Sequence, residues 1–130
     1  MPKVDSPSAK VVHLSIANKR QENFQKFPVY NNGKYHFITY ANIVYFEATS
    51  NYTIIHLSNQ EKMVISKTLK SIEASIPDHR FFRIHSKYVI NLEHIEQLQK
   101  NSSGAIINVK DTSLPISRRK FPHLKTILGI

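Results

Sequence analysis

Apolar and polar residues alternate along much of the chain, most regularly between Phe81 and Leu92. In that run one set of positions is apolar or aromatic, and the other contains the cationic or ionisable side chains of Arg83, His85 and Lys87. A period of two residues is typical of a β-strand with one face in a core and one face in solvent. The solvent face of this predicted strand carries hydrogen-bond donors and positive charge, which suit a phosphate backbone.

Short runs of β-prone residues, separated by turn signals, fill the rest of the chain from residue 27 onward. The clearest turn signal is Asn31-Asn32-Gly33, because Asn-Gly tolerates the positive φ angles of a two-residue hairpin turn. Turn signals at intervals of about 8–12 residues favour an antiparallel β-sandwich or barrel. The predicted strands are residues 27–30, 34–38, 43–48, 52–57, 62–65, 81–92, 95–100, 105–109 and 114–117.

One short α-helix is predicted between two of these strands. Leu69, Ile72 and Ile76 recur at helical spacing, Ser66 is the expected N-cap, and Pro77 prevents continuation. The predicted fold class is therefore mainly β, an antiparallel sheet assembly or sandwich of about ten short strands with one short α-helix.

The two ends of the chain differ from its middle. Residues 1–26 are polar and contain two prolines, so we expect an N-terminal tail or linker, followed by one folded domain over residues 27–130. The apolar patch at residues 11–16 is either a short element of this tail or a strand that adds to a sheet edge or a partner. Residues 118–128 are a second candidate for a short helix, because the proline at 122 suits a first helical turn.

The charge of the chain points to an anionic partner. Eighteen Lys and Arg against nine Asp and Glu give a formal net charge of +9, which favours nucleic acid first and an anionic membrane surface second. A basic protein without such a partner is the remaining interpretation. The absence of cysteine excludes disulfides and thiolate chemistry, and no apolar run approaches the roughly 20 residues of a membrane span. The simplest expected location is the cytoplasm.

Three polar clusters lie between or at the ends of the predicted strands, and their side chains suit DNA. Asn51 can read adenine through two hydrogen bonds, an arginine of the third cluster can read guanine, and Lys87 can meet a phosphate. Each cluster also has a structural explanation. The first consists of ordinary turn residues, and the third is a solvated basic run. In the second, Arg83 is an anchor that pairs with Glu47 or Glu73. The clusters are Ser50-Asn51-Tyr52, Arg83 with His85-Ser86-Lys87, and Ser117-Arg118-Arg119-Lys120.

Signatures of catalysis are missing from the sequence. The chain has only three glycines and no glycine-rich phosphate loop, its seven histidines are scattered, and no serine lies in a nucleophile-elbow pattern. We therefore expect no enzymatic activity, no catalytic residue, no metal site and no cofactor.

Three motifs, in order, resemble the LytTR DNA-binding domain, a family of output domains found in many bacterial response regulators of two-component systems. Residues 43–52 read IVYFEATSNY, residues 82–91 read FRIHSKYVIN, and residues 115–118 read PISR. The family typically has I-x-Y-(I/F)-E-A-x-x-x-Y, F-x-R-x-H-x-S/K-(Y/F)-(V/I)-(V/I)-N and P-(V/I)-S-R at these places. The similarity extends over about residues 28–128.

The resemblance implies an elongated antiparallel β fold whose loops enter successive major grooves of double-stranded DNA and bend it. It also implies a role in regulating transcription. Members commonly bind as pairs on repeated sites, which implies a homodimer. Base readout would fall to Asn51 and Arg118, with backbone contacts from Lys87, Arg119 and Lys120. Arg83, His85 and Asn91 would organise the fold beside the site. Carried over by motif, the groove-facing residues are Asn51 and Tyr52 in a first loop, Ser86 and Lys87 in a second, and Arg118, Arg119 and Lys120 in a third.

Two questions stay open at this point. Family members commonly follow a receiver domain, and the residues before 27 are too few for one, so the chain is either free-standing or a fragment, and its sensor or kinase partner is unknown. The alternative functions are a β-domain that binds single-stranded nucleic acid by stacking on its six Tyr and seven Phe, and a protein-interaction module.

Overall fold

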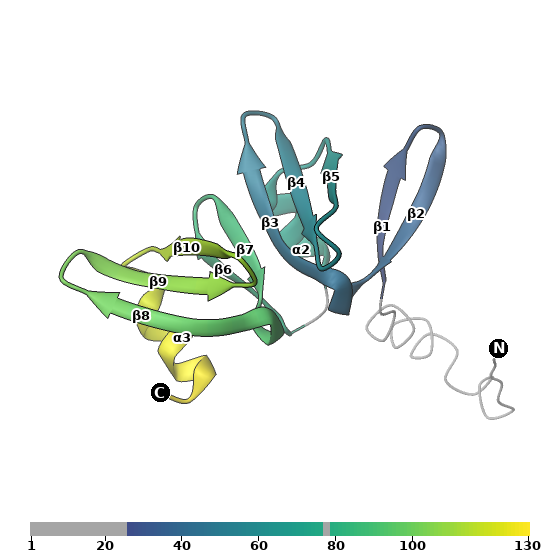
Figure 1. The fold of residues 1–130 in the computed structure, drawn as a ribbon. Helices are drawn as coiled ribbons and strands as arrows, with labels where there is room; N and C mark the ends of the chain where they lie inside the picture. The colour runs from purple at the N-terminus through teal and green to yellow at the C-terminus, as the bar shows by residue number, and fades with distance from the viewer. Residues whose placement is uncertain (1–25, 77–78) are drawn as a thin grey trace, which may run out of the picture.

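A computed structural model describes residues 26–76 and 79–130, which form ten strands and two α-helices (Figure 1). The predicted tail and the apolar patch at residues 11–16 lie outside the described residues, except that Lys26 already begins the first strand. The elements are β1 (Lys26–Asn31), β2 (Lys34–Thr39), η2 (Tyr40–Asn42), β3 (Ile43–Thr49), β4 (Tyr52–Leu57), β5 (Lys62–Ile65), α2 (Leu69–Ser75), β6 (Phe81–His85), β7 (Tyr88–Asn91), η3 (Leu92–His94), β8 (Ile95–Asn101), β9 (Gly104–Val109), β10 (Thr112–Ile116) and α3 (Phe121–Leu128).

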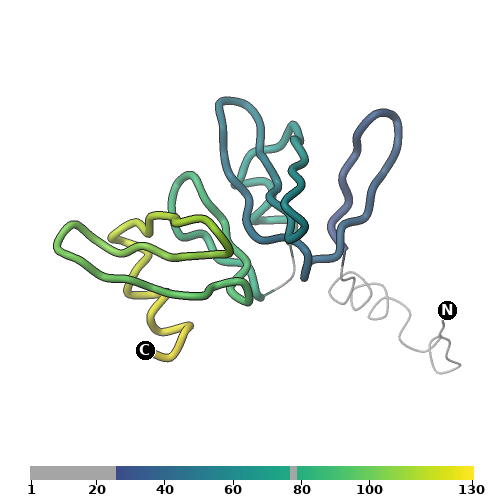
Figure 2. Tube along the Cα trace, in the orientation of Figure 1, coloured from purple at the N-terminus to yellow at the C-terminus, as the bar shows by residue number. Residues whose placement is uncertain are grey.

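The strands form three antiparallel sheets that follow one another along an elongated molecule (Figures 1 and 2). A central sheet has the order β5-β4-β3-β7-β6, a second sheet has the order β10-β9-β8, and β1 and β2 form a third sheet of two strands. The predicted fold class, an elongated antiparallel assembly of about ten strands, is confirmed. The second candidate helix is formed as α3, so the described chain has two α-helices rather than one.

The run from Phe81 to Leu92, predicted as one alternating strand, is a hairpin, and this prediction was wrong. It divides into β6 and β7, which pair with each other and leave Ser86 and Lys87 in the turn between them. The reason lies in β7, a central strand whose neighbours are β3 and β6. Val89 and Ile90 point to opposite faces and are both buried, because each face of the sheet is covered. A strand buried on both faces is continuously apolar and shows no alternation.

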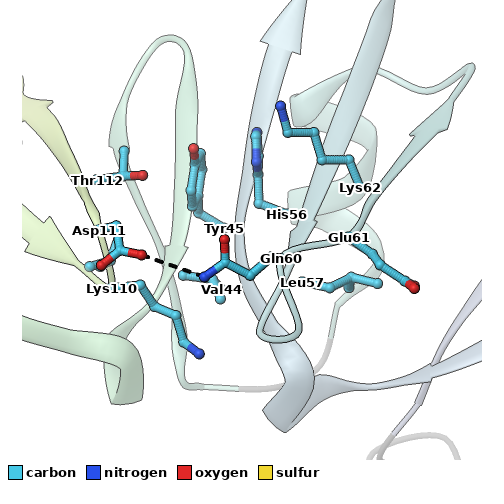
Figure 3. A pocket seen from close by; sticks show the side chains of 11 residues that line it. Val44, Tyr45, His56, Leu57, Gln60, Glu61, Lys62, Lys110, Asp111 and Thr112 are labelled. Atoms are coloured by element: carbon cyan, nitrogen blue, oxygen red, sulfur yellow. Dashed lines mark hydrogen bonds between the residues drawn. The ribbon is translucent and has the colours of Figure 1, made fainter.

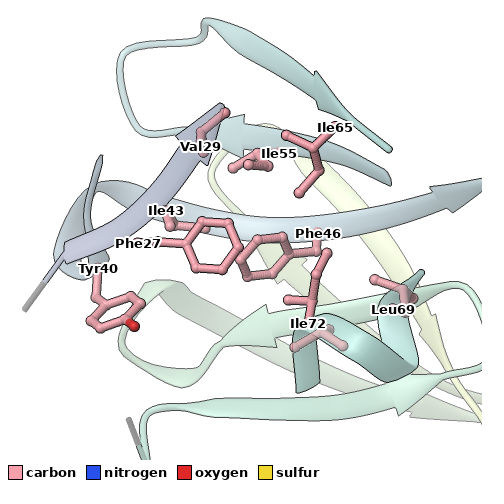
Figure 4. Close-up of a cluster of buried hydrophobic side chains, with 10 residues drawn as sticks. Phe27, Val29, Tyr40, Ile43, Phe46, Ile55, Ile65, Leu69 and Ile72 are labelled. Carbon is pink, nitrogen blue, oxygen red and sulfur yellow. The ribbon is translucent and has the colours of Figure 1, made fainter. Parts of the chain in front are cut away.

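Two hydrophobic cores lie on the two faces of the central sheet. The first joins the sheet to β1 and α2 and contains Phe27, Phe46 and Ile72 (Figure 4). The second joins the opposite face to the β8–β10 sheet and α3, and contains Ile84 and Leu124. The central sheet is therefore covered on both faces, and the ends of its strands remain as the places where loops reach solvent.

Helix α2 begins later than the sequence predicted. Its N-cap is Thr68 rather than Ser66, and the Thr68 hydroxyl accepts a hydrogen bond from the Ser71 N–H at 3.1 Å. The segment before it is held to the sheet, because the Thr53 hydroxyl donates to the Lys67 carbonyl at 2.6 Å. The N-cap threonine follows this anchored carbonyl by one residue, and the helix begins at Leu69.

Asn91 ties the end of β7 to two other elements from within the core. It is fully buried, and its amide group donates hydrogen bonds to the carbonyls of Tyr40 (3.2 Å) and Ile43 (3.0 Å). Its side-chain oxygen accepts from the Glu93 N–H at 2.9 Å, which caps η3. A buried amide that satisfies three backbone groups fixes where β7, η2 and η3 meet.

Candidate nucleic-acid interface

Two backbone hydrogen bonds bring the three predicted clusters to one end of the central sheet. The Ala48 N–H donates to the Lys87 carbonyl at 2.8 Å, so the β3–β4 turn lies beside the β6–β7 turn. The Ser117 N–H donates to the Ile84 carbonyl at 2.8 Å, which holds the segment after β10 against the end of β6. The order along this end is therefore the β3–β4 turn, the β6–β7 turn and the β10–α3 segment (Figure 2).

The first cluster occupies the turn between β3 and β4. Asn51 is exposed in the turn itself, and Tyr52, which begins β4 opposite Thr49, is half exposed at 49%. The strands below it carry the buried residues Phe46, Thr53 and Ile55. An exposed amide is thus displayed on a rigid hairpin.

The second cluster is a tight turn whose backbone is held by side chains from β6. Arg83 donates from Nε to the His85 carbonyl at 2.9 Å and from Nη2 to the Ser86 carbonyl at 2.8 Å. His85 Nδ1 accepts from the Lys87 N–H at 3.1 Å. These bonds satisfy three polar backbone groups of the turn. The side chains of Ser86 and Lys87 are exposed, and the Ser86 hydroxyl lies 3.5 Å from His85 Nδ1.

Arg83 also connects this turn to α2. Its Nη1 lies 3.0 Å from Glu73 Oε1, which is one of the two pairings that the sequence allowed. Glu47, the other candidate, instead lies 2.8 Å from His56 Nε2 on the neighbouring strand β4. The guanidinium group therefore contacts two carbonyls and a carboxylate at once.

The third cluster forms a turn between β10 and α3. The Ser117 carbonyl accepts from the N–H groups of Lys120 and Phe121, each at 3.1 Å, and the Ser117 hydroxyl lies 3.3 Å from the Lys120 N–H. Arg118 and Arg119 are exposed in this turn, whereas Lys120 is half buried. Two cationic side chains therefore project from the end of the row that adjoins β6.

The opposite end of the central sheet carries different chemistry. A cavity of about 140 Å³ lies between the β4–β5 turn and the β9–β10 hairpin (Figure 3). Two hydrogen bonds connect its sides. Lys110 Nζ donates to the Ser58 carbonyl at 2.7 Å, and Gln60 Nε2 donates to Asp111 at 3.4 Å. Burial raises the pKa of the Tyr45 phenol that lines the cavity, and the nearby Glu47 carboxylate adds to the effect. These contacts join two sheets and lie away from the three clusters.

The described residues contain neither a cluster suited to a metal ion nor a helix suited to a membrane. In residues 26–76 and 79–130, no group of three or more His, Asp or Glu side chains could hold a metal ion. No helix in the same part of the chain is long and apolar enough to cross a membrane.

The fold and the motif order together define a family. The model of the LytTr DNA-binding domain matches residues 33–129, so the chain belongs to this family of DNA-binding domains. A solved LytTr DNA-binding domain from Bacillus cereus superposes with a TM-score of 0.70 at 17% identity, covering 82% of this chain and 98% of that one, and so shares the fold.

The relatives include two transcriptional regulators and a sensory transduction protein. The transcriptional regulatory protein LytR of Staphylococcus aureus is 29% identical over 119 residues, which are 89% of this chain and 48% of LytR. The heme-containing CO-sensing transcriptional regulator RcoM 2 of Paraburkholderia xenovorans is 25% identical over 95% of this chain and 46% of its own length. The sensory transduction protein LytT of Bacillus subtilis is 37% identical over 68 residues, 51% of this chain and 28% of LytT. The chain thus spans about half the length of the first two relatives.

Proposed function

We propose that this chain binds double-stranded DNA at specific sequences to regulate transcription, and that its three loops insert into successive major grooves. The observation that carries the proposal is the alignment of the three polar clusters at one end of a rigid sheet, joined by the backbone hydrogen bonds at Ala48 and Ser117. The net charge of +9 supports attraction to a polyanion, and membership of a DNA-binding domain family supports DNA as that polyanion.

The order of the loops suggests how they share the work. In this proposal the two outer loops read bases, through Asn51 and Arg118, because amide and guanidinium groups match adenine and guanine edges. Lys87 lies in the loop between them and contacts the phosphates that border the groove which this loop enters. Arg119 and Lys120 add backbone contacts beside Arg118.

Ser86 and Tyr52 complete the proposed interface as hydroxyl donors to phosphate or to base edges. We further propose that two copies bind repeated sites, in keeping with the family resemblance. A titration of the chain into a duplex with two repeats, followed by sedimentation, is expected to reach two copies per duplex and one copy on a single site. One copy on the two-repeat duplex would refute this part of the proposal.

Selection of bound duplexes from a random pool tests the central claim. We expect enrichment of one short sequence, and single-stranded DNA of that sequence should compete poorly with the duplex. Failure to enrich any sequence, or equal competition by the single strand, would contradict the proposal and favour a stacking or protein-binding module.

Two substitutions separate base readout from phosphate contact. Arg118→Ala is expected to cost about 1–3 kcal/mol of binding free energy and to relax preference at one base pair. Lys87→Ala should weaken binding to all sequences alike and flatten the slope of log affinity against log salt by about 1. Lys62→Ala is the matched control, because Lys62 is exposed at the start of β5, away from the three loops. If Arg118→Ala and Lys87→Ala both bind like the control, the loop assignment is wrong.

A further inference from the structure

A groove of about 440 Å³ lies between the β1–β2 hairpin and the end of β5, outside the three loops. Its walls include Tyr30 and Asn32 of the hairpin, Val64 of β5, and Ser66 and Lys67 of the segment that follows β5. Figure 1 shows the hairpin standing beside the central sheet, with its tip on the same side as the β3–β4 turn.

The groove is continuous with the proposed interface. Thr53 pairs with Ile65, and its hydroxyl donates to the Lys67 carbonyl, so Lys67 lies beside the start of β4. Asn51 precedes Thr53 by two residues, in the adjoining turn. The end of β5 and the tip of the β1–β2 hairpin therefore extend the row of loops by one more position, next to the Asn51 loop.

The lining of the groove suits a sugar-phosphate backbone. Tyr30 and Tyr35 face each other across the hairpin with ring centroids 5.0 Å apart, yet they are 62% and 65% exposed. The lining contains Lys67 and no carboxylate, and the exposed Lys34 lies at the hairpin tip opposite Asn31. Lysine, tyrosine and asparagine are among the side chains that bond phosphate oxygens in protein–DNA complexes, and tyrosine rings offer an apolar surface to the sugar.

We propose that this groove binds the backbone of the same duplex, in the stretch that flanks the base pairs contacted by the Asn51 loop. Lys34 and Lys67 each neutralise one phosphate, and the hydroxyl groups of Tyr30 and Tyr35 donate to phosphate oxygens. The inference rests on the proposed function and extends it, because it adds a fourth contact that lengthens the DNA footprint on one side only.

The test compares three duplexes made from the sequence that the random pool yields. One carries only the core site, and the other two extend it by about one helical turn, about 10 base pairs, on one side or the other. The wild-type chain is expected to gain affinity from one extension alone. With that extension, the slope of log affinity against log salt should steepen by about 1.8, which is about 0.9 for each of two phosphates. The ratio of the affinities for the extended and the core duplex should therefore fall about tenfold between about 50 and about 200 mM salt.

The double variant Lys34→Ala, Lys67→Ala is expected to lose this gain and to bind the core duplex as the wild type does. Both side chains are exposed, so the variant should unfold at the wild-type temperature. Tyr35→Phe, which removes only a hydroxyl, is expected to lose part of the gain, whereas Lys62→Ala at the other end of β5 should keep all of it.

The failure of this inference differs from the failure of the proposed function. Wild-type binding to the core duplex with no gain from either extension would overturn the fourth contact and leave the three loops intact. A gain that survives in the double variant would overturn it as well. If the wild-type chain binds none of the three duplexes, the proposed function fails, and the fourth contact fails with it.

Discussion

Replacing Asn91 with alanine should destabilise the domain through three backbone groups rather than through lost apolar contact. The side chain is completely buried, and its amide donates to the Tyr40 and Ile43 carbonyls at 3.2 and 3.0 Å. Its oxygen accepts from the Glu93 N–H at 2.9 Å. Alanine removes all three bonds, although the Tyr40 carbonyl keeps a further donor, the Ile43 N–H. Removing one partner of a buried hydrogen bond is the costly way to lose it.

The size of the effect follows from what each backbone group keeps after the substitution. The Ile43 carbonyl loses a buried donor, and a buried polar group without a partner costs about 1–3 kcal/mol. The Tyr40 carbonyl keeps the Ile43 N–H as a donor, so its loss is closer to the roughly 1 kcal/mol of one hydrogen bond. The Glu93 N–H is only partly buried and water can satisfy it. We therefore expect Asn91→Ala to lower the free energy of unfolding by about 3 kcal/mol, a large share of the roughly 5–15 kcal/mol that a domain has in total.

Urea unfolding followed by circular dichroism measures this difference. Asn108→Ala is the matched control, because that amide makes only solvent-exposed side-chain bonds, to Gln97 and Ser113, and should cost under about 1 kcal/mol. A loss for Asn91→Ala below about 1 kcal/mol, or equal to that of the control, would refute the reasoning that Asn91 locks the junction of β7, η2 and η3.

Two further predictions concern groups near the proposed interface and in the second core. Glu73→Ala should lower the free energy of unfolding by at most about 1 kcal/mol, because the ion pair between Glu73 and Arg83 is partly exposed. Arg83→Ala should weaken DNA binding more than Glu73→Ala does, because it also removes the bonds to the carbonyls of His85 and Ser86, and equal affinities of the two variants would contradict this. Burial raises the pKa of the Tyr45 phenol in the folded state above its ordinary value of 10.0, so as the pH increases this phenol ionises first in the unfolded chain. The contribution of Tyr45 to the free energy of unfolding is therefore complete below about pH 10 and is lost above it. Tyr45→Phe should flatten that fall in urea unfolding between about pH 9 and 11, and an unchanged slope would exclude Tyr45 as its cause.

The strands were predictable wherever a turn signal separated them. Asn32 and Gly33 have positive φ angles of 53° and 74° in the β1–β2 turn, as the Asn-Gly signal implied. The β6–β7 hairpin escaped prediction because its turn, Ser86-Lys87, has no glycine, proline or asparagine, and because β7 is apolar on both faces. Local composition identifies turns that need unusual backbone angles, but not those that side chains hold from the neighbouring strand.

The residues of the candidate site were also easier to predict than their support. The motifs singled out all three clusters, but the choice between Glu47 and Glu73 as the partner of Arg83 depended on which elements pack together. The β3–β7 pairing decides this over a separation of about 40 residues, and no local pattern records such a pairing. No local pattern marks Lys34 or Lys67 for the same reason, since the β1–β2 hairpin and the end of β5 reach the Asn51 loop only through the way the sheets are placed.

The architecture separates the groups that stabilise the domain from those proposed to bind. Both faces of the central sheet are covered, so its interior side chains, such as Phe46 and Ile84, are fully buried and unavailable to a partner. The exposed side chains of the β6–β7 turn and the β10–α3 turn contribute little packing, so Lys87 and Arg118 can be varied at little cost in stability. Arg83 belongs to both groups, because it holds the turn that presents Lys87 while its own guanidinium group is engaged. A variant at Arg83 should therefore change binding and stability together, whereas variants at Arg118 should change binding alone.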